Sequence, residues 1–127
     1  MQISEPTNEN FIVSWAYSRE EWKTFSRWQA KQNGFFHYIL IVLFAKKQFA
    51  SGVQLTSNSV HLGRQAVVFS NEENELRRID IHDKGKFNLM NIAFRNKASH
   101  QITEIKFPIP KGRLKEAIVL RERLLGR

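Results

Sequence analysis

The sequence predicts an α+β fold: a strongly bent antiparallel sheet or partly open barrel, with an N-terminal amphipathic helix and a C-terminal capping helix. Three observations lead to this prediction. A helix signal stands near the start of the chain, short alternating strands separated by turns follow it, and an amphipathic helix ends the chain. Because 127 residues leave room for one ordinary core, residues 1–127 are expected to form a single domain.

The N-terminal helix is expected over residues 19–32, directly after a short strand. Ser18 is a favourable N-cap, and Glu21 stands three residues later, where a capping box requires it. Tyr17 and Trp22 occupy the two positions of a hydrophobic staple. These signals predict the start of the helix from residues close together in the chain.

On this helix an aromatic face lies beside a basic stripe. The aromatic face consists of Trp22, Phe25 and Trp28, and the stripe of Arg19, Lys23, Arg27 and Lys31. Such a pattern is typical of a helix that lies in a membrane interface. It is equally typical of a helix docked on a sheet with its basic residues in water, and this docked interpretation is favoured.

The most apolar stretch of the chain is "GFFHYILIVLFAKK", residues 34–47. A membrane-spanning helix needs about 20 apolar residues, whereas runs of about 10 to 14 are usually buried or interfacial. Residues 35–45 carry no charge, but they are too few to span. We expect a buried or interfacial segment, as a strand that joins the helix to the sheet, with Lys46 and Lys47 where it returns to water. Residues 11–47 thus hold the first strand, the aromatic-basic helix and this segment.

Residues 49–127 are expected to hold five or six short antiparallel strands and the final helix, since turn signals recur every eight to twelve residues. In "KFNLMNIAFR", the apolar residues change from one parity to the other. This change predicts a β-bulge near residues 90–91.

The final helix should follow Pro110 and should cover the part of the core that the strands leave open. A core-facing stripe is expected from Leu114, Ala117, Ile118, Leu124 and Leu125. Arg121 lies inside this stripe and is expected to snorkel to water, the alternative being a pair with a carboxylate or a partner.

The formal net charge of +8 favours an anionic partner: nucleic acid, anionic lipid or an acidic protein face. The last seventeen residues contribute +4, from six basic and two acidic residues. The chain has no cysteine, which excludes disulfides, thiolate metal sites and cysteine nucleophiles. A soluble protein that happens to be basic is the alternative explanation of the charge.

No catalytic motif is found, and no catalytic residue, metal ligand or cofactor is assigned. The four histidines are scattered without a metal-binding spacing. The segment "PKGR" at the start of the final helix offers backbone N–H groups beside Lys111 and Arg113. These groups predict a weak anion site.

Two motifs carry a resemblance to a known family. Tyr17, Ser18, Glu20, Glu21 and Trp22 form the first motif, and Ile109, Pro110, Lys111 and Gly112 form the second. With the order of elements, they resemble the bacterial pleckstrin-homology-like (PH-like) proteins of the YcxB-like kind, which are mostly uncharacterised proteins of bacterial membranes. The resemblance implies a PH-like sheet closed by a final helix, but no reaction. This chain has only the short segment 35–45 where such relatives carry a membrane hairpin.

The leading hypothesis is a non-enzymatic binding module at the cytoplasmic face of a membrane, docking on a membrane protein or anionic lipid. The contact would come from Arg19, Lys23, Arg27, Lys31, Trp22, Trp28, Lys46 and Lys47. A soluble interaction subunit of a larger assembly is the second hypothesis, and a nucleic-acid-binding protein is the third. A small-molecule substrate is not expected.

Overall fold

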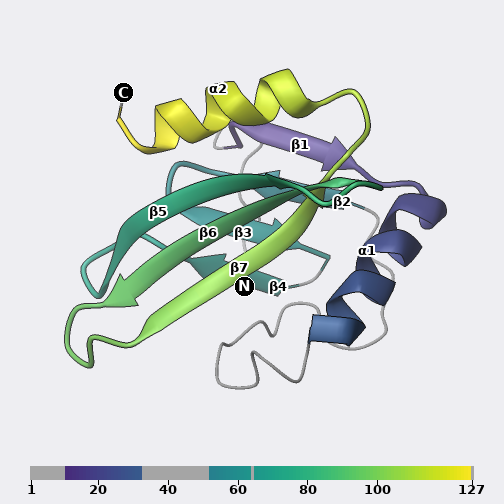
Figure 1. The fold of residues 1–127 in the computed structure, drawn as a ribbon. Helices are drawn as coiled ribbons and strands as arrows, with labels where there is room; N and C mark the ends of the chain where they lie inside the picture. Colours follow the sequence, from purple (N-terminus) through teal and green to yellow (C-terminus); the bar gives the residue numbers. More distant parts are fainter. Residues whose placement is uncertain (1–10, 33–51, 64, 127) are drawn as a thin grey trace.

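The computed structural model describes residues 11–32, 52–63 and 65–126. Its elements are β1 (Val13–Ala16), α1 (Arg19–Gln32), β2 (Gly52–Leu55), β3 (Ser59–Leu62), β4 (Gln65–Val68), β5 (Asn74–Asp83), β6 (Asn88–Asn96), β7 (Ile102–Ile109) and α2 (Leu114–Leu124). Strands β1 to β4 form one antiparallel sheet in sequence order, and β5 to β7 form a second (Figure 1). The α+β class is confirmed. In the described ranges the strands form two separate ladders, and they do not close into a barrel.

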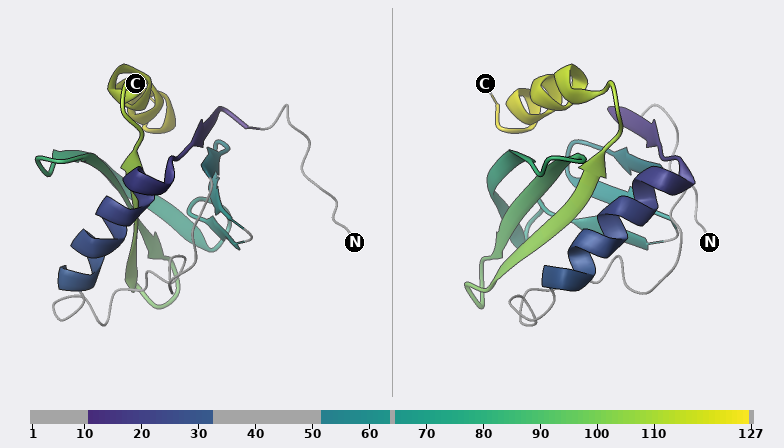
Figure 2. Two further views of the ribbon diagram at one scale, coloured as in Figure 1. Left: turned by 90° about the vertical axis from the view of Figure 1, so that its right-hand side faces the viewer. Right: turned by 45° about the vertical axis from the view of Figure 1, so that its right-hand side comes forward.

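One cluster of buried apolar side chains joins both sheets and both helices. In Figure 2 the two sheets cross one another, α2 lies over one end of them, and α1 lies beside the second sheet. The largest fully buried side chains come from widely separated parts of the chain: Phe25, Phe69, Phe107, Leu55 and Leu120. The alternating apolar residues of the strands therefore serve a single shared core.

Helix α1 begins as the sequence predicts, at a capping box. The backbone N–H of Ser18 donates to Glu21 Oε1 at 2.8 Å, and the backbone N–H of Glu21 donates to Ser18 Oγ at 3.0 Å. The rings of Tyr17 and Trp22 are in contact, with centroids 5.5 Å apart, as a hydrophobic staple requires. These local contacts satisfy backbone donors of the first turn and fix where the helix starts.

The aromatic face of α1 is docked on the protein. Trp22 is only 6% exposed and Phe25 only 1%, and α1 packs beside β7. This confirms the docked interpretation of the helix. Trp22 and Phe25 are part of the core and Trp28 is half-buried, so these side chains do not form a face that could insert into a membrane.

The bulge predicted near residues 90–91 is wrong. Strand β6 pairs with β7 without a break, and the register shift lies instead in β5, between Leu76 and Arg78. Consecutive residues Leu89 and Met90 point to opposite faces of the sheet, and both are buried. The apolar residues change parity because both faces of this central strand are covered.

Helix α2 is rotated relative to the predicted core-facing stripe. Its buried residues are Ala117 and Leu120, whereas Leu114 and Ile118 are each 39% exposed. The prediction that Leu114 and Ile118 face the core is therefore wrong. Arg121 is half-buried and its Nε donates to Glu122 Oε2 at 3.2 Å, which is the carboxylate pairing considered as the alternative to snorkelling.

The predictions for residues 34–47, including Lys46 and Lys47, lie outside the described residues. Within the part of the chain that is described, no helix is long and apolar enough to cross a membrane.

Candidate functional site

The basic stripe of α1 is at the surface. Lys23, Arg27 and Lys31 are all exposed, and none of the three forms an ion pair with another described residue. Arg19, at the start of the helix, is exposed as well. Trp22 does not reach the surface with them, because its side chain is buried against Tyr17 and Phe25, so its assignment as a partner contact is corrected.

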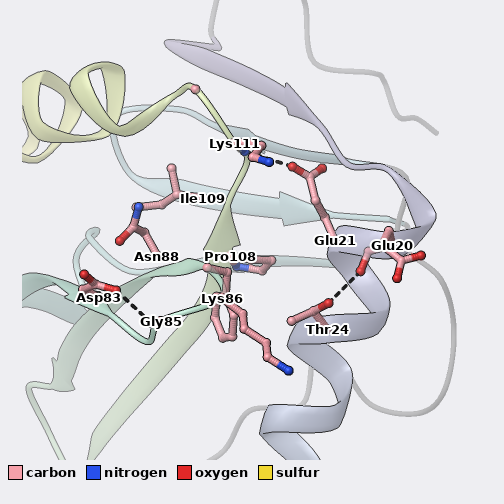
Figure 3. A pocket seen from close by; sticks show the side chains of 12 residues that line it. Glu20, Glu21, Thr24, Asp83, Gly85, Lys86, Asn88, Pro108, Ile109 and Lys111 are labelled. Atoms are coloured by element: carbon pink, nitrogen blue, oxygen red, sulfur yellow. Dashed lines mark hydrogen bonds between the residues drawn. The ribbon is translucent and has the colours of Figure 1, made fainter.

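The turn between β5 and β6 brings Lys86 toward α1 (Figure 3), and Lys84 lies in the same turn. The Phe87 ring meets the rings of Phe25 and Trp28 edge-on, with centroid separations of 6.0 and 5.8 Å. Lys84 Nζ lies 5.3 Å from the centroid of the Trp28 ring, a cation–π contact. Lys86, two residues later, is exposed beside α1 in the same turn. Trp28 is half-buried and fixes this turn against the helix.

We call the basic surface the exposed basic residues of α1 together with those of the turn that packs on it: Lys23, Arg27, Lys31, Lys84 and Lys86. By helical spacing, Lys31 lies near Trp28, three residues earlier, on the side of α1 where the turn docks. The two lysines of the turn are more than fifty residues away from α1 in the chain, and they were not among the predicted contact residues. No local sequence signal indicates that this turn packs against an aromatic helix.

A pocket of about 450 Å³ lies where the start of α1, the β5–β6 turn and the β7–α2 corner meet (Figure 3). Its wall carries both signs of charge: carboxylates from Glu20 and Asp83, and amines from Lys86 and Lys111. Facing carboxylates make a phosphate or another anion unfavourable inside it. The basic surface, and not this pocket, is therefore the candidate site for an anionic partner.

Part of the weak anion site predicted at Lys111 and Arg113 is occupied by a carboxylate of the chain. The backbone N–H of Lys111 donates to Glu21 Oε2 at 2.9 Å, and Arg113 Nη1 lies 3.6 Å from Glu116 Oε2. No side chain caps the first turn of α2 at Arg113. The anion site at Lys111 and Arg113 therefore stays a prediction, separate from the basic surface.

Glu21 and Tyr17 have shifted pKa values at this junction. Burial acts to raise the pKa of Glu21, but hydrogen bonds from the backbone of Lys111 and from Ser18 outweigh it, and the pKa lies below its ordinary value. Burial, with Glu21 nearby, raises the pKa of Tyr17 well above its ordinary value. The Tyr17 hydroxyl donates to the carbonyl oxygen of Pro108 at 2.7 Å. An ionised Glu21 and a neutral Tyr17 therefore hold α1 to the end of β7.

Among the described residues, no three His, Asp or Glu side chains come together as a metal-binding group. His61 is half-buried beside Ser59, and desolvation lowers its pKa. His82 and His100 are exposed. None of these histidines lies in the pocket or the basic surface.

No protein-family model, curated protein or solved structure matches this chain. The features that bear on function are the exposed charges, the buried aromatic residues and the polar junction at Glu21.

Proposed function

We propose that this protein is a non-enzymatic binding module that docks reversibly on the anionic inner face of the cytoplasmic membrane through the basic surface. The observation that carries the proposal is that the turn with exposed Lys84 and Lys86 packs on α1, the helix that carries exposed Lys23, Arg27 and Lys31. A basic residue near an anionic leaflet contributes about 1 kcal/mol, so five of them can hold a small domain at the surface.

The burial of the aromatic face defines the mode of docking. Because Trp22 and Phe25 are in the core, α1 does not offer an apolar face for insertion between lipids. Attachment would depend on charge alone and would weaken steeply with salt. The same burial counts against a single-stranded nucleic-acid binder, which needs exposed aromatic residues for base stacking.

The order of elements supports the proposed relationship to the PH-like, YcxB-like proteins. A sheet of four strands is followed by a sheet of three and a C-terminal helix, with α1 between β1 and β2. The two motifs of the resemblance are also joined in space, since Glu21 of the first accepts a hydrogen bond from Lys111 of the second. A shared structural role would explain why both occur in one chain. The PH-like, YcxB-like fold is thus part of the proposal.

Vesicle co-sedimentation tests the docking. The purified chain is mixed with vesicles of phosphatidylcholine alone, or with one quarter phosphatidylglycerol, at low and at high salt. We expect binding to the anionic vesicles at low salt and release at high salt. Equal recovery with both kinds of vesicle would contradict the proposal.

Two double variants of equal net charge locate the contact. Lys84→Glu/Lys86→Glu alters the basic surface, whereas Lys97→Glu/Lys115→Glu alters exposed residues elsewhere. Loss of two contacts of about 1 kcal/mol each corresponds to a roughly thirtyfold weaker vesicle affinity for the first variant. The second variant should bind within a few-fold of the native chain, apart from the general effect of charge. Equal loss in both would show that net charge, and not this surface, drives binding.

Gel retardation with duplex DNA and with single-stranded RNA, at the same salt concentrations, separates membrane docking from nucleic-acid binding. If nucleic acid is bound more tightly than anionic vesicles and the Lys84→Glu/Lys86→Glu variant loses that binding, the membrane proposal fails. The third hypothesis of the sequence analysis then takes its place.

A further inference from the structure

A second hollow lies on another part of the molecule, between β1 and α2. It has a volume of about 250 Å³ and is lined on one side by Ile12, Val13 and Ser14. On the other side it is lined by residues of α2 and its N-cap, of which Val119 is 66% exposed and Leu120 is buried. We call this hollow the β1–α2 groove. Its lining combines the buried apolar side chain of Leu120 and the exposed one of Val119 with three charged residues, Arg113, Glu116 and Arg123.

One wall of the groove is an edge strand. Strand β1 stands first in its sheet and pairs with β2 alone, so in the described ranges no strand pairs with its outer edge. An edge strand presents backbone N–H and C=O groups that can pair with an added strand. The β1 edge therefore adds backbone hydrogen-bonding capacity to the groove.

The other wall is helix α2, which runs along β1 in the opposite direction (Figure 1). A hydrogen bond from Trp15 Nε1 to Glu116 Oε1 holds the two elements together. Arg113 stands at one end of the α2 wall and Arg123 at the other. Arg113 is paired with Glu116 at 3.6 Å, while exposed Arg123 forms no ion pair with any described residue.

The spacing of these groups matches an extended chain. Ten helical residues separate Arg113 from Arg123, a rise of about 15 Å at 1.5 Å per residue. A β-strand rises about 3.3 Å per residue, so four to five strand residues cover the same length. Since alternate side chains of a strand share a face, carboxylates at positions i and i+4 with an apolar residue at i+2 would meet Arg113, Val119 and Arg123 together.

We propose that the β1–α2 groove binds an extended acidic peptide segment of a partner protein, which adds as a strand to the outer edge of β1. Its carboxylates pair with Arg113 and Arg123, and its central apolar side chain covers Val119 and reaches Leu120. This inference is independent of the membrane proposal, because the groove shares no residue with the basic surface.

The positive charge of the chain favours an acidic peptide over a second copy of the chain as the occupant of the groove. The chain carries a net charge of +8, and its last seventeen residues contribute +4 of it. Two copies that met through this region would bring like charges together, which opposes association. The groove itself has two arginines and one carboxylate, Glu116, which already accepts from Trp15 and lies beside Arg113, so an acidic segment still meets a net positive lining.

The peptide Thr-Glu-Thr-Val-Thr-Glu-Thr, acetylated and amidated at its ends, is the probe. NMR titration of the full chain should show shifts of the backbone amides of residues 12–16, of the Trp15 indole N–H and of the α2 amides. Two control peptides test the two parts of the proposal. Lysines in place of both glutamates remove the charge match, and prolines in place of the second and third threonines remove backbone donors. Both should bind at least about tenfold more weakly.

Matched variants of α2 locate the site on the protein. Val119→Glu places a negative charge in the groove, whereas Ile118→Glu places one at an adjacent, exposed apolar residue that does not line it. Because both side chains are exposed, both variants should keep the fold, which the amide spectrum verifies. We expect Val119→Glu to weaken peptide binding by about tenfold or more and Ile118→Glu to leave it within about twofold.

Four outcomes would overturn the proposal: no binding of the glutamate peptide at millimolar concentration, equal binding of the lysine peptide, equal effects of the two variants, or amide shifts confined to residues 84–86. Sedimentation of the chain without peptide tests the other occupant. A dimer that Val119→Glu dissociates would assign the groove to a second copy.

Discussion

Glu21, in the first turn of α1, accepts a hydrogen bond of 2.9 Å from the backbone N–H of Lys111, ninety residues later in the chain. The same carboxylate accepts the backbone N–H of Ser18 at 2.8 Å. One side chain thus caps its own helix and also holds the β7–α2 corner. A local helix signal is in this way also a tertiary contact.

Replacing Glu21 with alanine should lower the free energy of unfolding by about 2 kcal/mol, because two backbone donors lose a charged acceptor. Urea denaturation measures this loss. The matched control is Glu20→Ala, one residue earlier, whose exposed side chain forms no hydrogen bond or ion pair with a described residue and has only the general attraction of a carboxylate to the helix start. Its effect should stay near about 0.5 kcal/mol. Equal effects of the two substitutions would contradict the bridging role of Glu21.

The lowered pKa of Glu21 predicts an acid-sensitive contribution to stability. Protonation is harder in the folded protein than in the unfolded chain, so this contribution is present above the ordinary value of 4.5. It is lost as the pH falls through the lower folded-state pKa. Urea midpoints measured from pH 6 to pH 3 should therefore fall less steeply for Glu21→Gln than for the native chain. Parallel curves for the two proteins would refute the assignment.

Tyr17→Phe should destabilise the protein by about 2 kcal/mol, although the change removes a single oxygen. The hydroxyl is buried and donates to the carbonyl oxygen of Pro108 at 2.7 Å, so the variant leaves a buried acceptor without its donor. Thermal and urea unfolding measure the cost. A neutral or stabilising result would mean that the hydroxyl does not hold β7.

Gly52→Ala should weaken the pairing of β1 with β2 and cost more than about 1 kcal/mol. A Cβ at this position would lie 2.5 Å from the backbone oxygen of Trp15, so the two strands would have to separate. Gly63→Asn is the contrasting variant, because Gly63 has open space around it and a φ of 61°, which asparagine tolerates. Its effect on urea unfolding should be smaller. If Gly52→Ala is tolerated as well as Gly63→Asn, the close approach is not a constraint.

The sequence by itself determined the elements whose signals are local. The capping box of Ser18 and Glu21 fixed the start of α1, and its length follows from residues within the helix. Turn signals predicted five or six strands in residues 49–127, and the described part of this range holds six, β2 to β7. These signals are readable because capping and side-chain alternation depend on residues only a few positions apart.

Only the tertiary structure decided how these elements meet. It rotated α2 so that Leu120 is buried and Ile118 is exposed, and it covered both faces of β6. Two contacts between distant residues also appear only in the structure: the cation–π contact of Lys84 with Trp28, and the hydrogen bond from the Lys111 backbone N–H to the Glu21 carboxylate. Helix rotation and contacts between distant residues depend on how large side chains fill one shared core, and no short window of sequence contains that information. Of the basic surface, the residues on α1 could therefore be predicted from the sequence, whereas Lys84 and Lys86 of the turn could not.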